Sequence, residues 1–263
     1  MATTNSVLKK IISAAAGVAL SAGALTAVAP VATAAPGDST DFLTGARPGG
    51  VAQDAGGNLW VPNRDADSIS RVPLGQPIAS FATPANKPQF IAAGSDGNMW
   101  FSATATPDRG IGRITPEGSV SSFDAGNEGN STMEIALGPD GNMWYPVINQ
   151  TIGKITPAGV VTIFNSGGER FTWITPGPTG SNRMYLASRF NVNKLAYVTM
   201  DGAVTTFDGP ANVTRYNDIQ LINDQVWFTG QTGNGTAVLG RVVNDNEFVL
   251  LGNPSIVNPD QIG

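Results

Sequence analysis

The side chains that most often carry enzyme chemistry are unevenly represented in this sequence. Its 263 residues include no histidine and no cysteine. Mechanisms that use imidazole as base or metal ligand are therefore excluded, and so are Cys/His zinc sites and disulfides. What remains are carboxylate and amide side chains, whose oxygens could converge on one point. The candidates are Gln89, Glu134, Asn217, Asp218 and Asp260, with Glu134 and Asp218 as the candidate catalytic residues.

Arginines form a second group of candidates. Arg64, Arg109 and Arg189 each follow a strand-like run that contains a tryptophan or tyrosine. If the loops that carry them share one face, the three guanidinium groups could form a basic ring for an anionic group. The alternative is separate surface ion pairs, with Asp65 and Asp108 as the partners. Both possibilities depend on the elements that hold these residues.

Those elements belong to an internal repeat. The segment "IAAGSDGNMW" ends at Trp100, and related segments end at Trp60, Trp144, Tyr185 and Trp227. The spacings between these aromatic residues are 40, 44, 41 and 42 residues. Each unit continues with a run of the "IGRITPEG" type and then a short run that ends near a phenylalanine or leucine. Four strand-length segments in 40 to 45 residues are typical of one β-propeller blade.

The turn residues agree with this interpretation. The Asp-Gly pairs at Asp96-Gly97 and Asp140-Gly141 favour a two-residue hairpin turn with positive φ. In "TPEG" and "TPAG" the final glycine can supply the left-handed residue before the outer strand. Because a four-stranded sheet cannot bury both faces alone, we expect the repeated Trp, Ile and Phe side chains to pack between blades.

The first residues have a different character. Lys9 and Lys10 precede an apolar run over residues 11–32, and Ala32-Thr33-Ala34 resembles a cleavage site, which predicts a secretory signal over residues 1–34. An uncleaved membrane anchor is the alternative, although Pro30 interrupts the run. Residues 1–34 hold two lysines and no acidic residue, so their removal changes the formal net charge from −5 to −7. An exported, acidic chain is a poor partner for nucleic acid or anionic membranes.

We therefore predict an all-β protein, a β-propeller of four-stranded blades with five complete repeats and partial terminal strands. Residues 35–47 form an N-terminal segment with an outer strand at Phe42, and "NPDQIG" at the other end matches the start of an inner strand, "KPQFIA". The repeats are expected at about 48–87, 88–131, 132–171, 172–215 and 216–255, with a partial copy at 256–263.

The units "DGNMWFSATATPDRGIGRITPEGSVSSF" and "PDGNMWYPVINQTIGKITPAGVVTIF" resemble the repeat of the virginiamycin B lyase (streptogramin lyase) family. This resemblance covers Pro48 to about Leu251. It implies a propeller, seven-bladed in that family. It also implies a lactone-opening elimination of a cyclic depsipeptide antibiotic, in which a histidine acts with carboxylates and a bound Mg²⁺.

This sequence departs from the family pattern at the catalytic positions. The positions that align with the family's histidines are Gly49, Gln89, Met133, Thr172, Asn217 and Asp260. The glutamate that follows Trp-Phe-Thr is replaced by Asn63, Ala103, Val147, Ser188 and Gly230. No catalytic residue can be carried over from the family.

Two functions follow as expectations. The first is a secreted, non-catalytic binding module, expected to be a monomer without cofactor. Arg64, Gln89, Arg109, Arg189, Asn217 and Asp260 are its candidate contacts with a protein, peptide, glycan or small-molecule ligand. The second is a divergent lyase or a gluconolactonase-like lactonase that uses Mg²⁺ or Ca²⁺. It would require three or more carboxylate or amide oxygens that converge at the pore mouth, whereas isolated polar residues would simply be solvated there.

Overall fold

The computed structural model describes residues 47–73, 77–83, 87–104, 110–126, 130–190, 193–245 and 247–251. The predicted signal at 1–34, the outer strand at Phe42 and the partial copy at 256–263 lie outside these residues. Within the described part of the chain there is no helix long and apolar enough to cross a membrane. The regular structure there is twenty strands and one short 3₁₀ turn, η1 (Arg64–Ala66).

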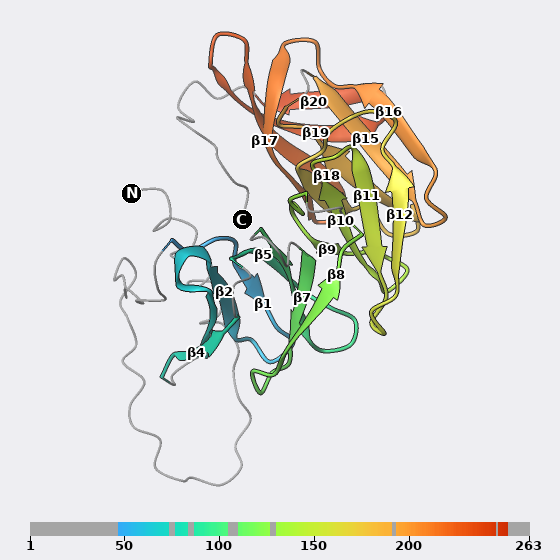
Figure 1. Ribbon diagram of the computed structural model, residues 1–263. Coiled ribbons are helices and arrows are strands. Elements are labelled where there is room, and N and C mark those ends of the chain that lie inside the picture. Colours follow the sequence, from blue (N-terminus) through green and yellow to red (C-terminus); the bar gives the residue numbers. More distant parts are fainter. Residues whose placement is uncertain are drawn as a thin grey trace, which may run out of the picture. The chain divides into compact units, whose positions relative to one another are not determined.

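The strands form five four-stranded antiparallel sheets, each from consecutive strands (Figure 1). The first blade holds β1 (Ala52–Gln53), β2 (Leu59–Asn63), β3 (Ser68–Val72) and β4 (Ala79–Ala82). The second holds β5 (Pro88–Ala93), β6 (Met99–Ala103), β7 (Gly110–Ile114) and β8 (Val120–Asp124). The third holds β9 (Ala136–Leu137), β10 (Met143–Val147), β11 (Thr151–Ile155) and β12 (Val161–Asn165). The fourth holds β13 (Trp173–Pro176), β14 (Arg183–Ala187), β15 (Lys194–Thr199) and β16 (Val204–Asp208). The fifth holds β17 (Val213–Ile222), β18 (Gln225–Thr232), β19 (Ala237–Asn244) and β20 (Glu247–Leu251).

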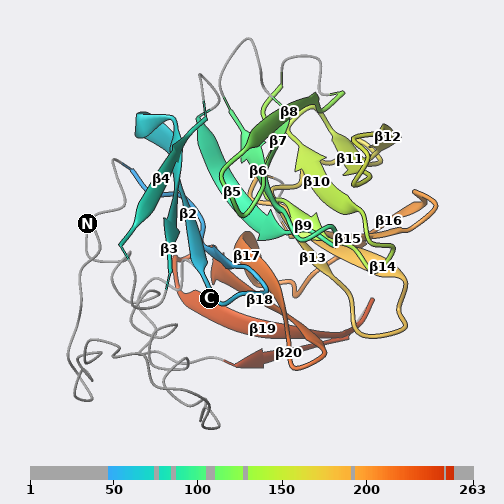
Figure 2. The same cartoon turned by 90° about the horizontal axis from the view of Figure 1, so that it is seen from below.

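The inner strands of consecutive blades lie side by side: β1 next to β5, β5 next to β9, β9 next to β13, and β13 next to β17 (Figure 2). The second strands of the first four blades are buried on both faces along almost their whole length. In β6 all five residues of "MWFSA" are buried, whereas the outer strand β8 alternates in exposure. A strand buried on both faces needs a continuous apolar run, and this accounts for the difference between the two segments.

The repeated aromatic residues lie between blades, as predicted. Trp100 belongs to a cluster with Met143 and Tyr145 of the next blade. Trp144 likewise packs with Ile174 of the blade that follows it. Trp60, Trp100 and Trp144 each also stack on the outer-strand phenylalanine of their own blade, and the Trp100 and Phe123 ring centroids are 5.3 Å apart.

The Asp-Gly turns differ from the predicted two-residue type. Only the glycine of each pair has positive φ, +77° at both Gly97 and Gly141. The aspartate is occupied in another way, because the Asp96 carboxylate accepts hydrogen bonds from the Asn98 backbone N–H and from Trp100 Nε1. Burial alone would raise the pKa of Asp96, but hydrogen bonds from the Asn98 side chain, from Trp100 Nε1 and from the Asn98 backbone N–H lower it below its ordinary value. The aspartate thus fixes the tryptophan and does not adopt a positive φ.

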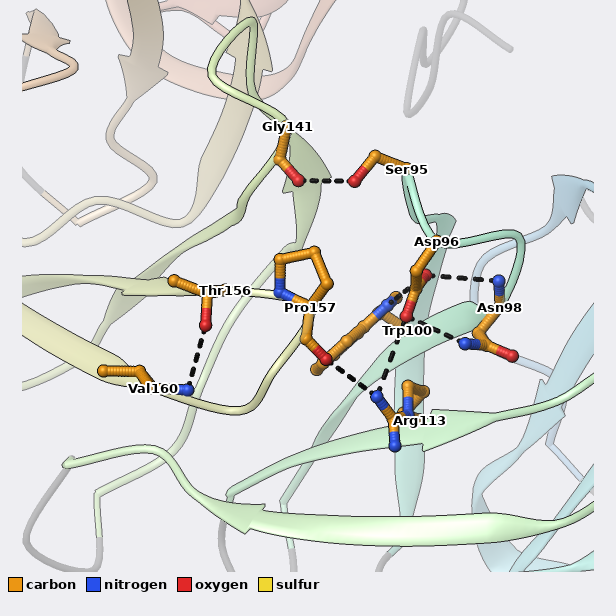
Figure 3. A network of polar contacts seen from close by, with 9 residues as sticks. All are labelled: Ser95, Asp96, Asn98, Trp100, Arg113, Gly141, Thr156, Pro157 and Val160. Carbon is orange, nitrogen blue, oxygen red and sulfur yellow. Dashed lines mark hydrogen bonds and ion pairs between the residues drawn. The ribbon is translucent and has the colours of Figure 1, made fainter.

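A basic residue opposite Trp60, Trp100 and Trp144 completes the contact between blades, and Figure 3 shows the contact at Trp100. Arg113 lies over the Trp100 and Phe123 rings, 5.4 and 5.3 Å from their centroids. Its guanidinium is 3.7 Å from the Asp96 carboxylate and donates a 2.8 Å hydrogen bond to the Pro157 carbonyl of the next blade. Arg71 and Lys154 make the corresponding contacts to the Pro116 and Met200 carbonyls. The aspartate, the tryptophan and the basic residue of the repeat therefore join neighbouring blades.

Candidate functional site

The polar residues of the inner strands meet where the third, fourth and fifth blades adjoin. Glu134 lies just before β9, and its backbone N–H donates to the Thr172 carbonyl at 3.2 Å. Its Oε2 accepts a 2.6 Å hydrogen bond from the Ile174 backbone N–H. Its Oε1 accepts a 3.4 Å bond from Gln220 Nε2 of the fifth blade. One carboxylate thus connects three blades.

Gln220 also links Glu134 to the second candidate carboxylate. Its Nε2 lies 3.4 Å from Asp218 Oδ1, which also accepts a 2.8 Å hydrogen bond from the Ile219 backbone N–H. Burial, and next the negative charge of Asp218, raise the pKa of Glu134 well above its ordinary value. The arrangement therefore favours the neutral carboxylic acid at Glu134 when Asp218 is ionised.

An irregularity in β17 places its polar residues at this point. Tyr216 pairs with Gly230 and Asp218 with Thr229, so Asn217 is the extra residue of a β-bulge. Asn217 is 4% exposed, and its side-chain oxygen and nitrogen make no hydrogen bond within the described part of the structure. Sequence periodicity alone does not reveal such a bulge.

The described residues of this cluster do not provide the set of ligands that a divalent metal needs. In the described ranges, no three Asp, Glu, His or Cys side chains lie close enough to hold a metal ion together. Between the two carboxylates stands the amide nitrogen of Gln220, a hydrogen-bond donor, where a cation would need an oxygen ligand. We therefore derive no catalytic step through a metal.

Of the remaining predicted site residues, the structure describes Gln89, Arg64 and Arg189. Gln89 is half-buried, and its backbone carbonyl accepts a 2.9 Å hydrogen bond from Gly50 between the first and second blades. Arg64 is half-buried in η1, and Arg189 is exposed after β14. No contact joins these two arginines in the described part of the chain. Arg109 and Asp260 lie outside the described residues.

Two residues of the cluster were missed by sequence reasoning. Gln220 follows Asp218 by two positions, so it lies on the same side of the strand, and this spacing was the available signal. Thr175 Oγ1 accepts a 2.9 Å hydrogen bond from the Leu221 backbone N–H, which ties the fourth inner strand to the fifth. Neither residue stands at a position that the repeat marks as special.

Comparison with known proteins agrees with the repeat and the fold. The model of the virginiamycin B lyase family matches residues 28–254. The chain belongs to this family. Comparison with curated proteins finds no match. The predicted resemblance and the β-propeller fold are both confirmed.

Three solved structures illustrate the similarity. A catalytically inactive histidine-to-alanine variant of virginiamycin B lyase from Staphylococcus aureus, with quinupristin, is 26% identical with a TM-score of 0.71. The match covers 81% of this chain and 71% of that chain. A streptogramin B lyase is 23% identical with a TM-score of 0.56, and 77% of this chain and 82% of that one are covered. The calcium-binding protein regucalcin from Agrobacterium tumefaciens is 16% identical with a TM-score of 0.58, and the match covers 78% and 74%. The last two are similar in fold.

Proposed function

We propose that this chain is a binding member of the virginiamycin B lyase family, which is exported and holds an extracellular ligand without cleaving it. One observation carries the proposal. The whole sequence lacks histidine, whereas a histidine-to-alanine substitution makes a family member catalytically inactive. A general base must lie within hydrogen-bond reach of the proton it removes, and no imidazole is available in this chain to do so.

The carboxylates give further support. Both oxygens of Glu134 are engaged by donors of the fourth and fifth blades, and burial together with the charge of Asp218 raises its pKa, which disfavours the ionised form that a base needs. Glu134 and Asp218 therefore have a structural role, and ligand recognition falls to exposed residues of the loops.

The test uses quinupristin as the probe, because a family member has been crystallised with it. The purified protein is incubated with quinupristin with and without Mg²⁺, and an active virginiamycin B lyase serves as the positive control. Elimination leaves the mass of the depsipeptide unchanged and hydrolysis adds one water, so chromatography and mass spectrometry are used together. We expect no ring opening.

Binding is measured separately by titration calorimetry, so that loss of catalysis and loss of recognition are distinguished. Ring opening that requires Mg²⁺ or Ca²⁺ and disappears in Glu134→Gln would instead establish the divergent lyase or lactonase. Heat of binding without product supports the proposal and identifies a peptide ligand. A protein that neither opens nor binds quinupristin is then screened against peptides and glycans by the same titration.

A further inference from the structure

The loop that follows β14 presents an arginine and a phenylalanine to solvent. Arg189 and Phe190 are both exposed, and the exposed fraction of Phe190 is 50%. Phe190 is the one exposed aromatic side chain in the part of the chain that the structure describes. Arginine and aromatic residues are enriched where proteins bind their partners. The composition of this loop is therefore typical of a recognition surface.

The base of the loop is held by Ser188, which is 0% exposed. Its Oγ donates a 2.7 Å hydrogen bond to the Arg170 carbonyl and accepts a 3.2 Å hydrogen bond from the Phe190 backbone N–H. Its backbone N–H donates to the Lys194 carbonyl at 3.2 Å, and its carbonyl accepts from the Tyr216 backbone N–H at 3.4 Å. The side chains that follow this serine are thus carried on a fixed base, which lowers the entropy cost of binding a partner.

The same serine brings a second arginine to the loop. Arg170 lies in the connection between the third and fourth blades, and its side chain is exposed. Strands β13 and β14 are antiparallel, so the residues before β13 and those after β14 lie at one edge of the fourth blade. We call the three exposed residues of this edge, Arg170, Arg189 and Phe190, the Phe190 patch.

Carboxylates do not neutralise the two arginines of the Phe190 patch. None of the ion pairs among the described residues includes Arg170 or Arg189. The hydrogen bond from Lys194 to Asp208, and then the charge of Glu169, raise the pKa of Lys194, so these two carboxylates act on a cation of their own. On a chain of formal net charge −5, this edge carries two guanidinium groups that can bind an anion.

The groups of the Phe190 patch select the chemistry of a partner. A guanidinium binds a carboxylate through paired N–H donors, whereas a phenylalanine ring has no polar atom and is best covered by an apolar side chain. An acidic peptide offers both kinds of group along one short segment. A polyanion without apolar groups would leave the ring in water. Charges more than about 8 Å apart are largely screened at physiological ionic strength, so the acidic remainder of the chain does not prevent this contact.

We propose that the Phe190 patch binds an acidic peptide segment, with carboxylates on Arg170 and Arg189 and an apolar side chain on Phe190. This inference rests on the proposed function, because it names the class of ligand that the exposed loops recognise. Ser188, one of the residues that replace the family's glutamate, holds the loop in this arrangement.

Fluorescence anisotropy with the full chain tests the proposal. The probe is a labelled peptide with glutamates on both sides of a central leucine, blocked at both ends, and its matched counterpart has glutamines in place of the glutamates. We expect the acidic probe to saturate below about 1 mM, and Arg170→Ala and Arg189→Ala each to weaken its binding about tenfold through the lost charge-assisted hydrogen bonds. Phe190→Ala should weaken binding about fivefold, because an apolar contact is lost.

Arg47→Ala is the control variant, because Arg47 is also exposed but lies 3.9 Å from Asp65 near the first blade. It should leave the affinity for the acidic probe unchanged, and thermal unfolding checks that every variant is folded. The proposal is overturned by a lack of saturation, by equal affinity for the two probes, or by alanine variants of Arg170 and Arg189 that bind like the unmodified protein. Tighter binding of polyphosphate than of the acidic probe also overturns it, because the partner would then be a polyanion.

This titration and the quinupristin assay fail independently. Ring opening of quinupristin refutes the proposed function, whatever the affinity for the acidic probe. If quinupristin stays intact and the acidic probe does not bind at the Phe190 patch, the chain can still be a binding protein, and only the assignment of an acidic peptide is refuted.

Discussion

Arg113 offers a direct measure of how strongly two blades are joined. Its guanidinium hydrogen-bonds the Pro157 carbonyl at 2.8 Å, lies 3.7 Å from the Asp96 carboxylate and covers the Trp100 and Phe123 rings. The side chain is 26% exposed, so these contacts are partly shielded from solvent. Replacing Arg113 with alanine removes them all and leaves the rest of the second blade intact.

The expected cost follows from those contacts. A hydrogen bond from a charged donor contributes about 1.5 to 3 kcal/mol. The cation–π contacts contribute about 0.5 to 1 kcal/mol, and the ion pair contributes about 0 to 1 kcal/mol. Since contributions within one network do not add fully, we expect Arg113→Ala to lower the free energy of unfolding by about 2 to 4 kcal/mol. For a domain of this size that corresponds to a decrease in Tm of about 4 to 16 °C.

Urea and thermal unfolding measure this loss. Arg113→Lys serves as the matched comparison, because Lys154 occupies the equivalent position in the third blade and reaches the Met200 carbonyl at 3.0 Å. We expect Arg113→Lys to lower the free energy of unfolding by about 1 kcal/mol, mainly because lysine lacks the planar set of donors of the guanidinium. Arg189→Ala, an exposed arginine, is the control and changes stability by less than about 0.5 kcal/mol. A loss below about 0.5 kcal/mol for Arg113→Ala, or equal losses for alanine and lysine, would refute this account of the blade junction.

Two further predictions concern backbone conformation and pH. Gly159 has φ of +86°, and a Cβ there would lie 2.5 Å from the Phe123 ring, whereas Gly97 has φ of +77° with nothing within 4 Å. Urea unfolding should therefore show that Gly159→Ala lowers the free energy of unfolding by at least about 2 kcal/mol and Gly97→Ala by about 1 kcal/mol. Equal decreases for the two variants would contradict the packing argument. Burial and the charge of Asp218 raise the pKa of Glu134, so its stabilising contribution is fully present below its ordinary value of 4.5 and is lost as pH rises through the raised pKa. The Tm of Glu134→Gln relative to the unmodified protein should increase from pH 4.5 towards neutrality, and parallel curves would show that Glu134 does not titrate in this way.

Much of the fold could be predicted because the sequence pattern of one blade recurs along the chain. The phase of Trp60, Trp100 and Trp144 gave four strands per blade and placed the aromatic residues between blades, and both predictions are confirmed. The Asp-Gly turn was predicted in the wrong form, because local turn preferences do not include the hydrogen bond from Trp100 Nε1 to Asp96. Trp100, which donates this hydrogen bond, lies outside the turn.

The candidate site was less accessible to sequence reasoning. Glu134 and Asp218 were selected as carboxylates of inner strands, but their mutual connection runs through Gln220, which no motif marks. Their separation in the sequence is 84 residues, and the bulge at Asn217 sets the side-chain positions. A bulge depends on the partner strand, so a single strand's periodicity cannot reveal it.

The sequence by itself determined the blade period, the aromatic and apolar residues that pack between blades and the absence of imidazole chemistry, because these depend on residue type and local spacing. The tertiary structure alone decided that Glu134 is engaged by a backbone donor and an amide donor, and that Gln220 connects it to Asp218. It also showed that the fifth blade carries Trp227 on a less covered face. The surroundings of the carboxylates and of Trp227 depend on which strands become neighbours, and these strands are far apart in the sequence. The free energy of burying a carboxylate or an indole depends on those neighbours.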